Sequence, residues 1–118
     1  MNFNHIGIKI LDIEKSKSFY INTLKCKMIC EKKNNETILI FLDSNGLTIE
    51  LIYKLDNSVR NYGPIDHLAF EVNNLDEEIL RFKTDGYEFS PKYTVGNHVI
   101  AFCDGPNNER IELMELLK

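Results

Sequence analysis

The chain lacks long apolar runs, an excess of basic charge and a disulfide framework. No hydrophobic segment approaches the roughly 20 residues that a membrane-spanning helix needs, and the N-terminal residues lack the pattern of a secretory signal. The net charge of −4 argues against nucleic acid, because phosphate binding favours a basic face. Three cysteines without framework spacing are typical of reduced thiols. We therefore expect a cytoplasmic protein that binds neither membranes nor nucleic acid.

An internal repeat with a constant offset of 62 residues is the dominant feature that the sequence does have. The offset aligns His5 with His67 and Glu50 with Glu112, so each half carries one His and one Glu that are 45 residues apart. A repeat that supplies one imidazole and one carboxylate per copy predicts a divalent-metal site with four protein ligands. The aligned segments are His5-Ile6-Gly7-Ile8 with His67-Leu68-Ala69-Phe70, and Thr48-Ile49-Glu50-Leu51 with Arg110-Ile111-Glu112-Leu113.

Each half has the pattern of a strand, a helix and three further strands. In the first half, the sequence predicts strands over residues 5–10, 27–32, 37–42 and 47–53 and a helix over residues 12–24. In the second half, it predicts strands over residues 67–72, 88–93, 99–103 and 110–116, with a helix that Asn74 caps and Gly86 ends. The expected fold is α+β, a single domain of two tandem βαβββ modules (residues 1–55 and 65–118) that form curved mixed sheets, with a linker over residues 56–64.

Strand alternation predicts that all four candidate ligands lie on the face of each sheet away from the helix. Ile49 and Leu51 then face the helix, whereas Glu50 lies on the other face with the nearby His5. The residues two positions after the histidines are small, Gly7 and Ala69, which leaves space for a metal and its ligand. Ile52 and Met114 would line this space with apolar groups. A lone strand histidine is more often structural, but recurrence in register favours a shared site over a duplicated fold that binds no metal.

These residues resemble the vicinal oxygen chelate superfamily, which includes glyoxalase I, methylmalonyl-CoA epimerase, fosfomycin-resistance thiol transferases, extradiol dioxygenases and bleomycin-binding proteins. The resemblance covers essentially the whole chain. It rests on Asn4-His5-Ile6-Gly7-Ile8, Ser18-Phe19-Tyr20, Thr48-Ile49-Glu50-Leu51, Asp66-His67-Leu68-Ala69-Phe70-Glu71-Val72 and Ala101-Phe102-Cys103-Asp104 followed by Arg110-Ile111-Glu112-Leu113.

Within this superfamily the chain is most similar to glyoxalase I (lactoylglutathione lyase) of the short bacterial type. Its metal ligands fall on His5, Glu50, His67 and Glu112. A second carboxylate counts against extradiol dioxygenases and fosfomycin-resistance enzymes, which typically use three ligands. The short interval of 17 residues from Glu50 to His67, and Asp104 after the penultimate strand, favour glyoxalase over the epimerase.

The resemblance implies a metal-dependent isomerisation. Nickel, cobalt or zinc would act as a Lewis acid, and the hemithioacetal of methylglyoxal and a thiol would become a 2-hydroxyacyl thioester through an enediolate. Glu112 would be the main base and Glu50 would move the proton on the other face. Lys9 and Lys54 stand where glyoxalase I commonly has Arg and Asn for glutathione. They could bind an anionic substrate tail, but the change leaves open another thiol or an unrelated substrate.

The resemblance also implies a homodimer, in which the complete site often draws one half from each chain. Two alternatives stay open. One is an epimerase that acts on an acyl-CoA by similar enolate chemistry. The other is a protein that binds a small molecule without catalysis, as bleomycin-binding relatives do; such proteins ordinarily lack the four ligands.

Overall fold

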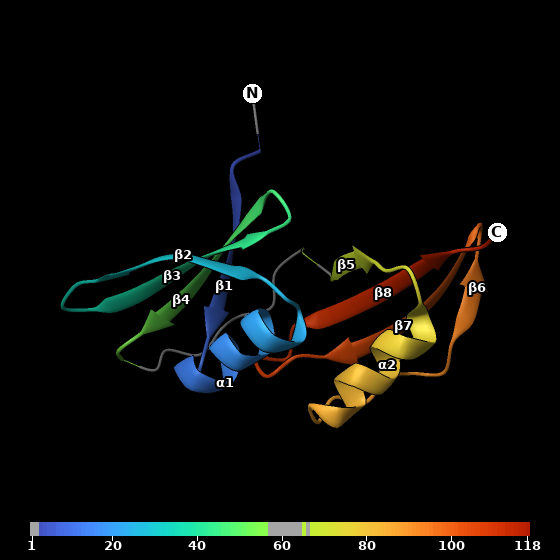
Figure 1. Ribbon diagram of the computed structural model, residues 1–118. Helices are drawn as coiled ribbons and strands as arrows, with labels where there is room; N and C mark the ends of the chain where they lie inside the picture. Colours follow the sequence, from blue (N-terminus) through green and yellow to red (C-terminus); the bar gives the residue numbers. More distant parts are fainter. Residues whose placement is uncertain (1–2, 57–64, 66) are drawn as a thin grey trace. The chain divides into compact units, whose positions relative to one another are not determined.

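The structure is a computed structural model that describes residues 3–56, 65 and 67–118. The chain divides into two compact units, the first built around strands β1–β4 and the second around β5–β8 (Figure 1). Apart from Asp56, the expected linker over residues 56–64 lies outside the described residues, and the module boundaries stay a prediction.

The first unit is a four-stranded mixed sheet accompanied by one helical segment. The strand order is β1-β4-β3-β2, in which β1 runs parallel to β4 and the other neighbours are antiparallel. Its elements are β1 His5–Ile10, α1 Ile13–Lys17, η1 Ser18–Thr23, β2 Lys27–Lys33, β3 Thr37–Ser44 and β4 Leu47–Lys54.

The second unit repeats this topology with the order β5-β8-β7-β6, and β5 is again parallel to β8. Its elements are β5 Leu68–Glu71, α2 Leu75–Thr84, β6 Tyr93–Val95, β7 His98–Asp104 and β8 Arg110–Leu116. The two units confirm the predicted α+β fold of two βαβββ modules.

The helices begin in the same way in both units. The Asp12 Oδ1 atom accepts a hydrogen bond of 2.9 Å from the Lys15 backbone N–H, and the Asn74 Oδ1 atom accepts one of 3.1 Å from the Glu77 N–H. Both are N-caps, which satisfy a donor that the first helical turn leaves free. The caps keep the 62-residue offset.

The helices end differently, and the constant offset breaks there. The Leu24 N–H donates to the Phe19 carbonyl over 2.8 Å, which is a wide i→i+5 turn. Beyond it, the bond from Cys26 N–H to the Tyr20 carbonyl (2.9 Å) corresponds to that from Tyr87 N–H to the Phe82 carbonyl (3.0 Å). The acceptors are 62 residues apart but the donors only 61. The wide turn η1 thus absorbs one extra residue.

The loop between β7 and β8 restores the offset. Asp43 pairs with Thr48 across the β3–β4 turn, whereas Asp104 pairs with Arg110 across the β7–β8 loop, which is therefore one residue longer. The prediction of a constant offset of 62 is consequently wrong between the helices and the last strands. It holds where the candidate ligands lie.

The predicted strand over residues 88–93 is also wrong, because only Tyr93–Val95 pairs with β7. Pro91 lacks the N–H that a paired strand must donate. Its neighbour Ser90 replaces part of the ladder: the Ser90 N–H donates to the Phe102 carbonyl over 2.8 Å, and the Ser90 Oγ atom accepts from the Phe102 N–H over 3.0 Å.

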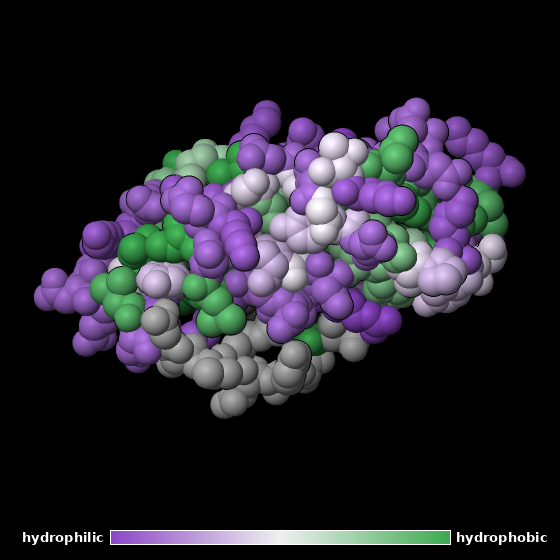
Figure 2. Space-filling model, turned by 90° about the horizontal axis from the view of Figure 1, so that it is seen from below, coloured by the Kyte–Doolittle hydropathy of each residue, from purple (hydrophilic) through white to green (hydrophobic). Residues whose placement is uncertain are grey.

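The buried residues lie on the predicted faces of the last strand of each unit. Ile49 and Leu51 of β4, and Ile111 and Leu113 of β8, are at most 1% exposed. The helical segments contribute large buried side chains as well, namely Phe19, Tyr20, Leu75 and Phe82. On the molecular face seen in Figure 2, hydrophilic residues predominate and hydrophobic ones form separate patches. Among the described residues, no helix is long and apolar enough to cross a membrane.

Candidate metal centre

The first unit brings His5 and Glu50 together by pairing β1 with β4. Gly7 lies opposite Glu50 in this parallel register, so His5, two residues earlier, shares a face with the carboxylate. The His5 Nε2 atom is 3.9 Å from the Glu50 Oε1 atom. The Glu50 side chain is 16% exposed and that of His5 is 40% exposed. The pair therefore lies at a partly enclosed position on the sheet face away from the buried Ile49 and Leu51.

The second unit does the same with His67 and Glu112. Ala69 lies opposite Glu112 in the β5–β8 register, and His67 immediately precedes β5. The His67 Nε2 atom is 3.6 Å from the Glu112 Oε1 atom, with side-chain exposures of 34% and 13%. Two pairs that are distant in sequence thus have nearly the same local geometry.

Each nitrogen–oxygen separation suits a bridging metal better than a direct hydrogen bond. An N–H···O bond in proteins spans about 2.7–3.2 Å, and both pairs are farther apart. Two donors that each lie about 2.1 Å from a metal are separated by roughly 3.0–3.4 Å at octahedral or tetrahedral angles. Imidazole nitrogen and carboxylate oxygen are also the donors that first-row divalent metals accept. The two pairs therefore fit a divalent metal after small side-chain movements.

Gly7 is required by the geometry of the first pair. A Cβ atom at this position would lie 3.1 Å from Ile52 Cδ1 and 3.5 Å from Glu50 Oε1. The space beside the ligands is thus already used by these two side chains, and a larger residue would displace one of them.

The second nitrogen of His5 has its own partner. The His5 Nδ1 atom lies 2.7 Å from the Asn4 Oδ1 atom, so a proton on Nδ1 can be donated to this amide oxygen. That tautomer leaves the Nε2 lone pair directed toward Glu50. Metal-binding histidines are commonly oriented by such a contact.

Two aromatic residues that the sequence analysis missed complete the rows of the site face. Phe41 lies opposite Glu50, and Phe102 lies opposite Glu112. The ring of Phe102 meets His67 edge to face at 5.6 Å between centroids. The signal was available for Phe41, because a two-residue Asn45-Gly46 turn with positive φ at both positions fixes the β3–β4 register.

Each of these aromatic rings also carries a cation. The Arg110 guanidinium carbon is 4.0 Å from the Phe102 ring centroid, and the Lys32 Nζ atom is 5.4 Å from that of Phe41. Sequence analysis assigned neither cation to the site, since each reaches it through a partner on another strand.

The predicted substrate-binding lysines lie on the site face of the first unit. Lys9 is opposite Ile52 in the β1–β4 register, two residues beyond the row of Gly7 and Glu50. Lys54 ends β4 and is exposed. No described group of three or more His, Cys, Asp or Glu side chains could hold a metal, so neither described unit alone gathers more than its one His and one Glu.

The buried cysteines are chemically distinct from the candidate ligands. Burial raises the pKa of the Cys103 thiol to about 12, and the nearby Asp104 and Glu109 carboxylates add to this effect. Burial also raises the pKa of Cys26. Both thiols are therefore held neutral at ordinary pH, and neither is a nucleophile or metal ligand in that form.

Comparison with known proteins identifies the family. The family model described as the Glyoxalase/Bleomycin resistance protein/Dioxygenase superfamily matches residues 4–103. The chain is 33% identical to the uncharacterized protein YwkD of Bacillus subtilis, over 97% of this chain and 96% of that protein. It is 27% identical to a lactoylglutathione lyase of Salmonella typhimurium, over 98% of this chain and 93% of the lyase.

Solved structures share the fold at lower sequence identity. A glyoxalase family protein from Enterococcus faecalis matches with a TM-score of 0.84 and 22% identity over 97% of both chains. The fosfomycin resistance protein FosX from Listeria monocytogenes, in complex with Mn(II) and sulfate, matches with a TM-score of 0.79 and 20% identity over 97% of this chain and 91% of FosX. With its repeated βαβββ units and matching family model, the chain belongs to the glyoxalase/bleomycin resistance protein/dioxygenase superfamily.

Proposed function

We propose that the chain is a divalent-metal-dependent lyase of the glyoxalase I type, with His5, Glu50, His67 and Glu112 as ligands of one metal. The observation that carries the proposal is the repeated His–Glu pair, with nitrogen–oxygen separations of 3.9 and 3.6 Å. Either one chain supplies both pairs, or each of two chains in a homodimer supplies one.

The substrate in this proposal is the hemithioacetal of methylglyoxal and a thiol, either glutathione or another. A bound nickel, cobalt or zinc ion would stabilise negative charge on the substrate oxygens. Glu112 removes the proton from the carbon that bears sulfur, and Glu50 returns a proton to the neighbouring carbon, which gives a 2-hydroxyacyl thioester. Lys9 and Lys54 would attract an anionic part of the thiol.

The partial enclosure of the two carboxylates supports this assignment. Gly7 and Phe41 flank Glu50, and Ala69 and Phe102 flank Glu112, each in one row of its sheet. An apolar ring on one side limits water around each carboxylate, and a small residue on the other leaves access for substrate. The lactoylglutathione lyase relatives support the same chemistry.

The test is an assay of methylglyoxal isomerisation with glutathione, after the protein has been stripped of metal and reloaded with nickel, cobalt, zinc or manganese. We expect metal-dependent turnover that falls roughly 10²–10⁴-fold in Glu112→Gln. Glu36→Gln, in the exposed turn before β3, is the matched control and should retain activity.

The other outcomes separate the alternatives. Tight metal binding without turnover of this substrate would direct the search to acyl-CoA epimerisation and other thiols. A protein that binds no metal under any of these conditions would contradict the proposal and favour a binding function.

A further inference from the structure

The second unit carries a stacked guanidinium beside its His–Glu pair. Arg110 and Glu112 lie two residues apart on β8 and so share a face of the sheet. Phe102 is opposite Glu112 on β7 and contacts both the His67 ring and the Arg110 guanidinium. One aromatic ring therefore links a candidate metal ligand to a cation.

Stacking orients the guanidinium for anion binding. An arginine over an aromatic face keeps its N–H donors in the plane of the group, where they can meet a carboxylate or a phosphate with two parallel bonds. The 4.0 Å distance to the Phe102 centroid is well within the range of such a contact. Less side-chain freedom is then lost when an anion binds.

Asp104 is the competing anion at this position. It lies directly opposite Arg110 in the β7–β8 register and is exposed. One carboxylate cannot use all five N–H donors of a guanidinium, so Asp104 weakens the attraction for a second anion without abolishing it. This makes a prediction of opposite sign possible, because removing the Asp104 charge should strengthen anion binding.

The first unit has no equivalent arrangement. Thr48 stands at the position that aligns with Arg110, and the cation near Phe41 is Lys32, whose Nζ atom is 5.4 Å from the centroid. An ammonium also lacks the planar fork of a guanidinium. The two half-sites therefore present similar metal ligands but different cations.

We infer that Arg110, supported by Phe102, binds an anionic group of the substrate, a carboxylate or a phosphonate. Residues two apart on a strand are separated by roughly 7 Å, so this group lies about that far from the atoms near Glu112. The inference rests on the proposed function and deepens it: the substrate class is an anionic molecule, and the second unit recognises its charge.

The experiment follows the Arg110 Nε–H signal by NMR during titration of the zinc-loaded protein with three probes. Glutathione carries carboxylates, glutathione diethyl ester has them masked, and methylphosphonate carries the alternative anion. We expect saturable shifts with glutathione, methylphosphonate or both, and none with the diester. The probe that binds more tightly identifies the anion.

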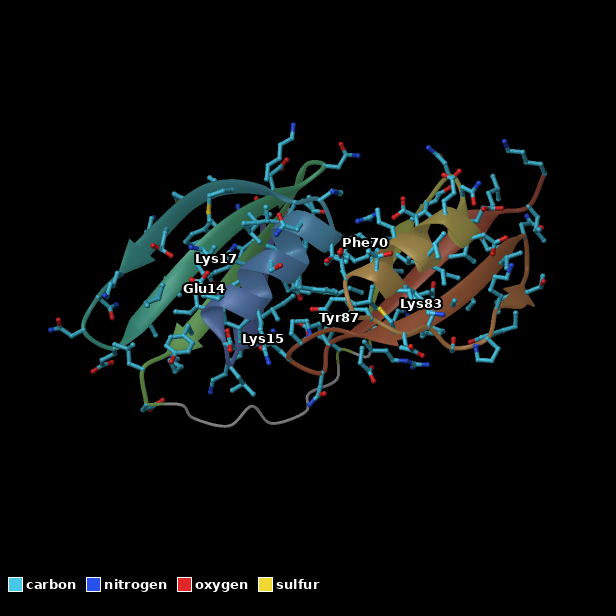
Figure 3. The ribbon with its side chains drawn as sticks, turned by 60° about the horizontal axis from the view of Figure 1, so that its bottom comes forward. Glu14, Lys15, Lys17, Phe70, Lys83 and Tyr87 are labelled. Carbon is cyan, nitrogen blue, oxygen red and sulfur yellow. The ribbon has the colours of Figure 1, made fainter. Side chains whose placement is uncertain are left out.

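Four variants make the result specific. Arg110→Gln should weaken binding of the preferred anion about tenfold or more, as expected for a lost charge-assisted bond. Phe102→Leu should weaken it by a smaller factor, and Asp104→Asn should strengthen it. Lys83→Gln removes a cation from the exposed last turn of α2 (Figure 3) and should change binding less than twofold.

The inference is overturned if Arg110 shows no saturable shift with either anion, or if Arg110→Gln binds them as Lys83→Gln does. Zinc binding by Arg110→Gln, measured by calorimetry, should equal that of the unmodified protein. If the unmodified protein binds no zinc, the proposed function fails, and the same titrations on the metal-free protein still decide the role of Arg110.

Discussion

The two units share a topology and a His–Glu pair but differ in how each pair is supported. His5 contacts the Asn4 amide through its second nitrogen, whereas His67 meets the edge of Phe102. The first unit absorbs an extra residue in its helix and closes β3–β4 with a two-residue turn, while the second has a longer β7–β8 loop. The register of the first and last strands is common to both. That register, rather than the helices or loops, positions the ligands.

The largest expected effect comes from removing one imidazole in each unit. His5→Ala and His67→Ala should each lower metal affinity by about 100-fold or more, because each deletes one of four ligands. Isothermal titration calorimetry with zinc or nickel measures the loss. If the two half-sites contribute equally, the variants should agree within about tenfold. Unchanged affinity in either variant would remove that histidine from the site.

The small residues beside the histidines should respond unequally. Gly7→Val places new atoms against Ile52 and Glu50, so we expect about 1–3 kcal/mol of destabilisation and weaker metal binding. Ala69→Val introduces fewer atoms at an exposed position and should cost less. Urea denaturation gives both free energies of unfolding, and an equal or reversed order would contradict the difference between the two units.

The longer loop of the second unit depends on Gly105. A Cβ atom there would lie 2.6 Å from the Glu109 carboxyl group, which is buried and accepts a 3.0 Å bond from the Asn107 Nδ2 atom. Gly105→Ala should therefore lower the free energy of unfolding by about 1–2 kcal/mol. Lys83→Ala in the same unit is the control. A thermal midpoint as high as that of the control would show that Glu109 can move without cost.

Cys103 should give the second unit a dependence on alkaline pH. Its folded pKa of about 12 is above that of an exposed thiol, so the unfolded state loses its proton first as the pH rises. The contribution is complete below pH about 8.5 and is lost progressively toward pH 12. Leu42 occupies the corresponding place in the first unit. Cys103→Ala should flatten the fall in unfolding free energy above pH 9, and an identical slope would contradict this assignment.

Sequence reasoning predicted those parts of the fold that depend on local signals. The caps at Asp12 and Asn74, the strand alternation around Glu50 and Glu112, and the glycine stop at Gly86 were all readable from residue type. The i→i+5 turn ending at Leu24 was not, because one extra residue in a helix leaves no mark on its composition. The strand expected over residues 88–93 failed because its hydrophobic pattern outweighed the missing donor of Pro91.

The candidate site could be predicted only in part for a similar reason. The four ligands stood out because the repeat marked them. Phe102 and Arg110 did not, since their place beside His67 and Glu112 depends on the cross-strand register after a five-residue loop, whose length fixes no register by itself. Register within one hairpin was derivable for Phe41, where the turn has two residues.

The most direct test of the account is the metal stoichiometry of the double variant His5→Ala/His67→Ala compared with the unmodified protein. Inductively coupled plasma mass spectrometry, after reconstitution with nickel or zinc and removal of free metal, gives the ratio of metal to chain. The account predicts about one metal per chain in the unmodified protein and none in the double variant. Equal metal content in both proteins, or no metal in either, would contradict it.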